Sequence, residues 1–170
     1  MAWSHDQNGT QRPSYDVAQI CLNGHVLTEA VAASPALAAK HCTKCGEATV
    51  TQCAACSASI RGRYRIPGLT GLPHPFPPRY CHDCGSPYPW TERALEAAKE
   101  EAQELTGLTD EEKNLLAKSL DDVARDTPRT PAAANNVKRL LSKAGPAAAQ
   151  LFRDVLVQVV SEAAKKRIWG

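Results

Sequence analysis

All seven cysteines of this chain fall in its first half, where they form four close pairs together with one histidine. Three pairs are Cys-x-x-Cys and one is Cys-x-x-x-His, spacings that are typical of metal-binding turns. A closed tetrahedral zinc site takes four sulfur or imidazole ligands, so eight ligands suit two such sites. Because no cysteine is left over, the full set is stronger evidence than one motif alone. The predicted ligands are Cys21, His25, Cys42, Cys45, Cys53, Cys56, Cys81 and Cys84.

Disulfides are the alternative use of these cysteines, and the sequence disfavours them. Seven is an odd number, and residues 1–15 lack the apolar stretch of a secretory signal. We therefore expect a cytoplasmic protein with two structural zinc ions. An aromatic content of only 5% argues against one large core, and bound zinc can replace part of a core. No apolar run of about 18 residues is present, so a membrane-spanning helix is not expected.

The composition changes sharply near Trp90 and predicts three parts. Residues 1–14 are polar and aperiodic, which indicates a mobile tail. Residues 15–90 hold every ligand and predict a small two-zinc head of the zinc-ribbon or treble-clef kind, with short β-hairpins. Residues 91–170 contain no cysteine and predict an all-helical region. The expected fold class is therefore α+β.

Caps and apolar periodicity predict four helices in the last part of the chain. Thr91 is the expected N-cap of the first helix, and Thr109 with Glu112 forms a capping-box pattern at the second. Pro131 suits the first turn of the third. The expected ranges are 92–106, 109–126, 130–144 and 146–168.

Charge is segregated between these helices. Residues 91–126 carry five Lys/Arg and eleven Asp/Glu, whereas residues 127–170 carry eight and two. Packing of an acidic helix pair on a basic pair is the simpler interpretation, and contact with an acidic partner is the other. For the whole chain, seven thiolates and two zinc ions would change the formal charge from +2 to about −1. Bulk charge therefore gives little reason to expect nucleic-acid binding.

The four ligand pairs can share two ions in three ways. Sequential pairing joins the first pair to the second and the third to the fourth, with spacers in the zinc-ribbon range. Crossed pairing joins the first to the third and the second to the fourth, as in RING- and FYVE-type cross-brace modules. Nested pairing joins the second to the third, but the β-branched segment 49–51 favours a strand between them. Sequential and crossed pairing rank nearly equal, ahead of nested pairing.

Catalytic motifs are not found beside the ligand pairs. The chain has no His-Glu-x-x-His motif, no His-x-Glu before a Cys-x-x-Cys, and no phosphate-binding glycine loop. A catalytic zinc also keeps one coordination position open, whereas eight ligands close both sites. We therefore expect a protein that is not an enzyme.

A specific resemblance runs from about residue 15 to residue 92. The resemblance rests on the order of the ligands and on two segments, Ile60-Arg61-Gly62 and Pro89-Trp90-Thr91-Glu92. This part of the chain resembles a family of uncharacterised bacterial zinc-ribbon proteins, classified as a domain of unknown function. This resemblance implies a bacterial cytosolic protein with structural zinc. It implies no activity.

The leading functional hypothesis is a zinc-stabilised interaction or scaffold protein, whose C-terminal helices bind a protein partner or form a homo-oligomer. One alternative is a RING-like cross-brace adaptor. Another is nucleic-acid binding by a basic, partly aromatic strand, where cations would follow phosphates and a ring would stack on a base. Membrane association is not expected. The candidate nucleic-acid-binding residues are Arg61, Arg63, Tyr64 and Arg65.

Overall fold

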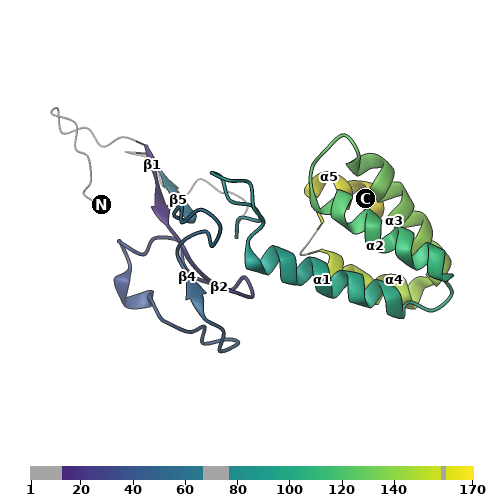
Figure 1. The fold of residues 1–170 in the computed structure, drawn as a ribbon, viewed down its shortest axis with the longest axis horizontal. Coiled ribbons are helices and arrows are strands. Elements are labelled where there is room, and N and C mark those ends of the chain that lie inside the picture. The colour runs from purple at the N-terminus through teal and green to yellow at the C-terminus, as the bar shows by residue number, and fades with distance from the viewer. Residues whose placement is uncertain (1–12, 67–76, 158–159) are drawn as a thin grey trace. The chain divides into compact units, whose positions relative to one another are not determined.

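The computed structural model of the chain describes residues 13–66, 77–157 and 160–170 (Figure 1). It consists of two compact units, Met1–Thr91 and Glu92–Gly170. The strands lie in the first unit and most of the helical residues in the second, as expected for an α+β chain. The predicted N-terminal tail lies outside the described residues up to position 12, and Ser14 already belongs to a strand.

The first unit contains two small antiparallel sheets. Strand β1 (Ser14–Val17) pairs with β5 (Arg61–Arg65), while β2 (Gln19–Cys21) lies between β3 (Val26–Thr28) and β4 (Thr49–Val50). A single turn of 3-10 helix, η1 (Pro35–Leu37), lies between β3 and β4 in the sequence. The β-branched segment that predicted an extended conformation therefore supplies β4.

The core of the first unit is small and contains sulfur. Ile20 and Ile60 are fully buried, and Tyr88 and Trp90 are nearly so. They pack with Ala18 and with two of the predicted ligands, Cys53 and Cys81. A core of this size stabilises a fold only weakly by itself.

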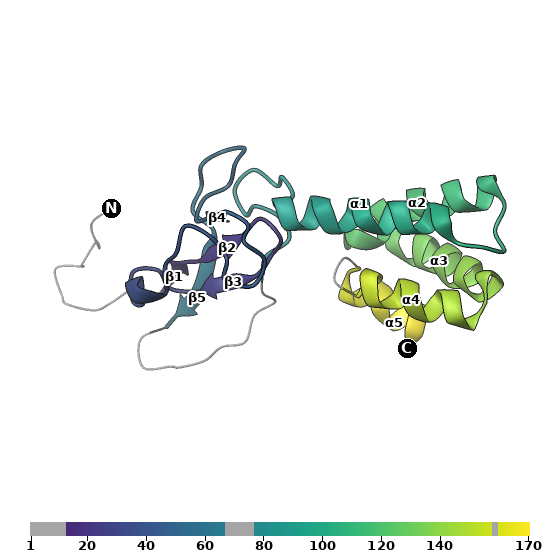
Figure 2. The ribbon, with the colours of Figure 1, turned by 90° about the horizontal axis from the view of Figure 1, so that it is seen from below.

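The second unit is built from helices α1 (Pro89–Glu104), α2 (Asp110–Ala124), α3 (Thr130–Ala144), α4 (Pro146–Leu156) and α5 (Glu162–Trp169) (Figure 2). Their apolar faces meet in one core that includes the fully buried Leu116, Leu120, Val137, Leu140 and Phe152. Among the described residues, no helix is both long and apolar enough to cross a membrane.

The start of α2 is as predicted from the sequence. The Thr109 hydroxyl accepts a hydrogen bond from the Glu112 N–H, and the Glu112 carboxylate accepts one from the Thr109 N–H. This reciprocal capping box satisfies two backbone donors that the helix itself leaves unpaired. Helix α3 also starts at the predicted Thr130.

The start of α1 differs from the prediction. The helix begins at Pro89, so Thr91 lies inside it and is not its N-cap. The Thr91 hydroxyl instead donates to the Arg79 carbonyl at 2.9 Å, and the Trp90 indole N–H donates to the Pro78 carbonyl at 2.8 Å. Both side chains thus hold the first turn of α1 against the preceding segment.

The predicted last helix, 146–168, is wrong as a single helix. Helix α4 ends at Leu156, and α5 begins after Ser161, whose hydroxyl accepts a hydrogen bond from the Ala164 N–H. The Ser161 N–H donates to the Val123 carbonyl of α2 at 2.9 Å. The helical spacing of apolar residues continues across the gap between α4 and α5, so it did not reveal the gap. The N-cap residue Ser161 is the local sequence signal for the start of α5.

Ion pairs in the second unit fit the simpler interpretation of the charge segregation. Lys143 of α3 contacts Glu112 of α2 at 2.7 Å, and Arg129 contacts Asp122 at 3.4 Å. Each pair joins the basic part of the chain to the acidic part. These contacts are solvent-exposed, so each contributes little to stability by itself.

Candidate metal centre

The eight predicted ligands gather in two sets of four. We call Cys21, His25, Cys42 and Cys45 the first cluster, and Cys53, Cys56, Cys81 and Cys84 the second cluster. Within each cluster, one ligand atom from every residue lies within 4.8 Å of the others. This is the sequential pairing. The crossed and nested pairings are not formed, so the arrangement on which a RING-like cross-brace adaptor depends is absent from the described residues.

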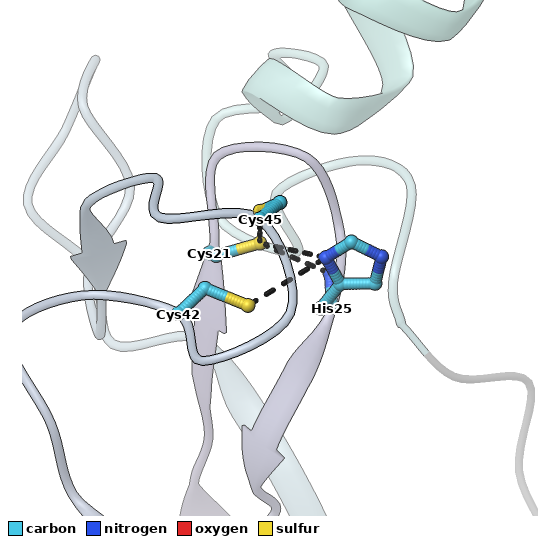
Figure 3. Close-up of side chains that lie close together, drawn as sticks. All are labelled: Cys21, His25, Cys42 and Cys45. Carbon is cyan, nitrogen blue, oxygen red and sulfur yellow. Dashed lines mark hydrogen bonds between the residues drawn. The ribbon is translucent and has the colours of Figure 1, made fainter.

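The distances within the clusters fit a tetrahedral ion. Zinc with Zn–S bonds of about 2.3 Å and Zn–N bonds of about 2.0–2.1 Å places two sulfurs about 3.8 Å apart, and a sulfur and a nitrogen about 3.5–3.6 Å apart. In the first cluster, Cys21 Sγ lies 3.8 Å from Cys45 Sγ, and His25 Nδ1 lies 3.5 Å from Cys21 Sγ and 3.6 Å from Cys42 Sγ (Figure 3).

The second cluster has the same spacing with sulfur alone. Cys53 Sγ lies 3.8 Å from Cys84 Sγ, and Cys56 Sγ lies 3.7 Å from Cys81 Sγ. These separations match edges of a tetrahedron around a zinc-sized ion, and the remaining ligand atoms of each cluster lie within 4.8 Å of one another.

A tight turn at the end of β2 positions the first two ligands. The Gly24 N–H donates to the Cys21 carbonyl at 2.8 Å, and the Cys21 N–H donates to the His25 carbonyl at 2.9 Å. Gly24 has a φ of +86°, which few other residues adopt without strain. The His25 N–H points at Cys21 Sγ at 3.3 Å, so the turn also provides a donor to a ligand sulfur.

The three Cys-x-x-Cys turns share one hydrogen-bond pattern. In each turn, the N–H of the first cysteine donates to the carbonyl of the residue five positions later in the sequence. The carbonyl of the same cysteine accepts a hydrogen bond from the N–H of the residue four positions later. Each turn is closed by an isolated bridge between positions seven residues apart: His41 with Ala48, Gln52 with Ser59, and Tyr80 with Pro87. The sequence showed the ligand pairs, but not that their surroundings repeat as well.

A left-handed residue follows the second cysteine in every turn. Gly46 and Gly85 occupy this position with φ of +74° and +72°, and Ser57 occupies it with φ of +62°. Ser57 is the one non-glycine residue with positive φ among the described residues. Sequence reasoning missed it because only the two glycines matched the familiar Cys-x-x-Cys-Gly motif.

The surroundings favour the thiolate form of at least one cysteine in each cluster even without a metal. Burial raises the pKa of Cys42, but hydrogen bonds from the Lys44 and Cys45 backbone and from neighbouring thiols lower it to about 6. Hydrogen bonds from the side chain and backbone of Ser86 lower the pKa of Cys84 to about 6. Thiolate is the form that binds a cation, so each cluster presents a negative ligand at neutral pH.

The thiols of Cys56 and Cys21 favour the protonated form. The Ala58 backbone hydrogen bond favours the Cys56 thiolate, but burial and the three neighbouring thiols raise its pKa to about 12. Burial also raises the pKa of Cys21. A bound dication would displace these protons, so metal binding at either cluster releases protons.

Two aromatic residues support both clusters, and the sequence did not identify them as such. The Tyr88 hydroxyl hydrogen-bonds with Cys81, and burial followed by the charge on Cys81 raises the pKa of Tyr88. The Tyr88 ring stacks on Trp90 with centroids 4.6 Å apart. Trp90 in turn occupies the space into which a side chain at position 24 would project. A Cβ atom added to Gly24 would lie 3.0 Å from the Trp90 Cβ.

The remaining histidines do not join the clusters in the described part of the chain. His41 and His82 are exposed next to ligands, and neither belongs to a group of metal-ligating residues. His5 and His74 lie outside the described residues.

The candidate nucleic-acid-binding residues all lie on β5 and are already engaged with β1 or its surroundings. Arg65 Nε lies 2.6 Å from an Asp16 carboxylate oxygen, and Arg63 Nε lies 3.8 Å from Glu29. Arg61 lies over the ring of Tyr15, which also contacts Tyr64. Tyr15 was not among the predicted residues.

Residues 14–168 match a protein family described as an uncharacterized protein conserved in bacteria (DUF2321). The match therefore runs through both clusters and through helices α1 to α4. No curated protein and no solved structure matches the chain.

Proposed function

The chain belongs to the bacterial family DUF2321, and from that premise we propose that it is a non-enzymatic scaffold. Two structural zinc ions would hold its first unit, and its helical unit would bind a protein partner. The observation that carries this proposal is the closure of both clusters by four protein ligands each. A catalytic zinc needs a position open to water or substrate, and neither cluster leaves one.

The donor atoms support zinc in particular. One cluster offers three sulfurs and an imidazole nitrogen, and the other offers four sulfurs. Zinc accepts both sets in tetrahedral geometry, whereas calcium, magnesium and manganese prefer oxygen. Bound zinc would supply folding free energy here, and Cys42 and Cys84 would meet it as thiolates.

The helical unit supports docking through charge more than through apolar surface. Phe152, Leu156 and Val160, the apolar residues of the last part of the chain that could have formed a dimer seam, are fully buried in the unit's own core. The exposed face of α1 instead carries glutamates at four-residue intervals, and none has an ion pair among the described residues. These are Glu92, Glu96, Glu100 and Glu104. Such a surface suits a partner with a basic docking face.

Native mass spectrometry with metal analysis tests the proposal, because it gives zinc content and oligomeric state together. We expect two zinc ions per chain. One ion or none, or iron in place of zinc, would contradict the metal assignment. A stable homo-oligomer would mean that the partner of the helical unit is a second copy of this chain and not another protein.

A matched histidine pair sharpens this test. His25→Ala removes a ligand from the first cluster, and should lower the zinc affinity of that cluster while the second stays loaded. His41→Ala removes an exposed neighbour of the same cluster and should retain both ions. Equal zinc loss in both variants would show that His25 is not a ligand.

A further inference from the structure

The side chains of β5 do not alternate as a regular strand requires. Tyr15 pairs with Tyr64 and Val17 pairs with Arg61, so the one residue between these pairs on β1 faces two residues on β5. Such a shift places an extra residue in one strand and turns the side chains beyond it to the other face. Arg61 therefore lies on the same face of the ribbon as Tyr64, whereas strict alternation would place it on the opposite face.

Gly62 makes this shift possible. A Cβ at Gly62 would lie 1.9 Å from the Glu29 carbonyl oxygen and 3.0 Å from the Ala18 nitrogen. The Arg63 N–H donates to the same Glu29 carbonyl at 2.9 Å. The backbone of β5 thus presses against residue 29, and only glycine fits there.

The shift assembles a stacked group of three side chains on the ribbon. The rings of Tyr15 and Tyr64 have centroids 4.6 Å apart and are tilted by 39°. The Arg61 guanidinium carbon lies 4.7 Å from the Tyr15 ring centroid. Tyr15 is 45% exposed, and Arg61 is exposed as well. Tyr64 is half-buried, and neither tyrosine ring belongs to the apolar core of the unit.

The other two arginines of β5 have carboxylate partners. Arg65 contacts Asp16, whose side chain is only 4% exposed, and Arg63 contacts Glu29. Arg61 has no ion pair among the described residues and rests on an aromatic face instead. The ribbon therefore presents flat aromatic and guanidinium surfaces with little net positive charge.

We propose that Tyr15, Tyr64 and Arg61 form a stacking platform for the unpaired bases of a single-stranded nucleic acid. Aromatic rings and guanidinium planes stack on any base whose face is free, so such a site requires single-stranded substrate. A duplex hides its base faces and is held mainly through phosphates, for which this ribbon offers too few free cations. The site lies in the first unit and does not depend on the partner proposed for the helical unit.

Weak salt dependence is the characteristic sign of this binding mode. The slope of log affinity against log salt is about −0.7 for each phosphate contact with a single strand. With Arg61 and the loosely paired Arg63 as the available cations, we expect about one or two such contacts. Binding through a broad basic patch would instead give a slope several times steeper.

Fluorescence anisotropy with the full zinc-loaded chain tests the proposal. The probes are labelled 15-nucleotide oligouridine and oligodeoxyuridine, which differ only in the sugar, with a 15-base-pair duplex for comparison, at low salt. We expect both single strands to bind better than the duplex. Tyr15→Ala and Tyr64→Ala should each weaken binding by about 5- to 100-fold, since stacking is the main interaction lost. The two single-stranded probes show whether the sugar contributes to recognition.

Matched variants separate stacking from other effects. Tyr15→Phe keeps the ring and should bind within a few-fold of the original chain. Arg61→Ala should also weaken binding, and its control is Lys40→Ala, which removes an exposed cation elsewhere in the unit. Leu37→Ala, at the most exposed large hydrophobic side chain of the described residues, controls for Tyr15→Ala. Both control variants should bind like the original chain.

A measurement on the unmodified chain covers the case in which a tyrosine variant fails to fold. Oligonucleotides with 5-iodouracil should crosslink to Tyr15 or Tyr64 on irradiation, as mapped by peptide mass spectrometry. Crosslinks at neither residue, tighter binding to the duplex, no binding at low salt, or unchanged affinity in folded tyrosine variants would each overturn the proposal.

Discussion

Single residues in the metal-binding turns show why the sequence motif describes only part of them. Three turns place a residue with positive φ after their second cysteine, yet the residue is glycine in two and Ser57 in the third. The left-handed conformation costs a residue with a Cβ about 1–2 kcal/mol. The second cluster therefore holds a small strain that hydrogen bonds within the turn must outweigh.

We predict that Ser57→Gly stabilises the first unit by about 0.5–1 kcal/mol, because relief of the strain is partly offset by the greater freedom of unfolded glycine. Gly46→Ala and Gly85→Ala should destabilise it by about 1–2 kcal/mol. Apart from the chain neighbours, no heavy atom of the described residues lies within 4 Å of either added methyl group, so the effect of both substitutions is conformational. Denaturation of the zinc-loaded chain measures all three. An unstable Ser57→Gly variant would contradict the argument.

Glu112 gives a second prediction at the level of one residue. The hydrogen bond from Lys143, and then that from the Thr109 backbone, lower the pKa of Glu112. Its charge therefore stabilises the fold at neutral pH, and this contribution is lost as the pH falls below the ordinary glutamate pKa of about 4.3. Glu112→Gln should be less stable than the original chain at pH 7, and the difference should shrink as the pH falls through the lowered pKa of Glu112. Denaturation followed by the helical circular-dichroism signal, at a series of pH values, measures the difference.

The control for this variant is Glu100→Gln, at an exposed position of α1 without an ion pair among the described residues. It should change stability little over the same pH range. A difference between Glu112→Gln and the original chain that does not shrink with falling pH would assign the loss to geometry and not to charge.

At the level of elements, the pairing of β1 with β5 depends on one close approach. Because Gly62 lies against the Glu29 carbonyl, a methyl group there must displace backbone and not merely a flexible side chain. The one-residue shift in register, and with it the position of Arg61, relies on this contact.

We therefore predict that Gly62→Ala destabilises the first unit by about 2–3 kcal/mol, through overpacking. The loss should exceed that of Gly46→Ala, where space is open. Comparing the denaturation midpoints of these two alanine variants tests the claim directly. Equal losses would mean that the Glu29 contact adjusts at no cost.

The elements also show how far the sequence could be interpreted. The gathering of seven cysteines and one histidine into clusters, the capping box at Thr109 and the start of α3 follow from local spacing, and the structure has them where they were expected. The shared hydrogen bonds of Thr91, the Ser161 cap between α4 and α5, and the shift in β5 depend on contacts with distant residues. Neither the periodicity nor the spacing of residues reports which distant residues come into contact. For the same reason, the sequence does not determine which ligand pairs share a cluster.

For the whole molecule, the two units draw their stability from different sources. The second unit has a continuous apolar core with no metal-ligating cluster in its described residues, whereas the first has two clusters and a small core. Structural zinc contributes roughly 10–16 kcal/mol to folding in small zinc modules, more than such a core can supply.

We accordingly predict that zinc removal unfolds the first unit and leaves the helices intact. A strong chelator, with a thiol reductant to prevent disulfide formation, should abolish dispersed amide signals from residues 13–66 and 77–91. Most of the helical circular-dichroism signal should persist. Restored spectra on adding zinc would show reversibility, and full loss of helical signal would show that the second unit depends on the first.

The orientation of His25 has a consequence for spectroscopy. Its Nδ1 faces the sulfurs of the first cluster, so its Nε2 carries the ring proton whenever an ion is bound (Figure 3). The second cluster contains no imidazole. The imidazole nitrogen resonances of His25, observed in a long-range proton–nitrogen correlation spectrum, therefore distinguish the two clusters. They report metal binding at the first cluster, and metal binding at the second cluster gives no imidazole signal.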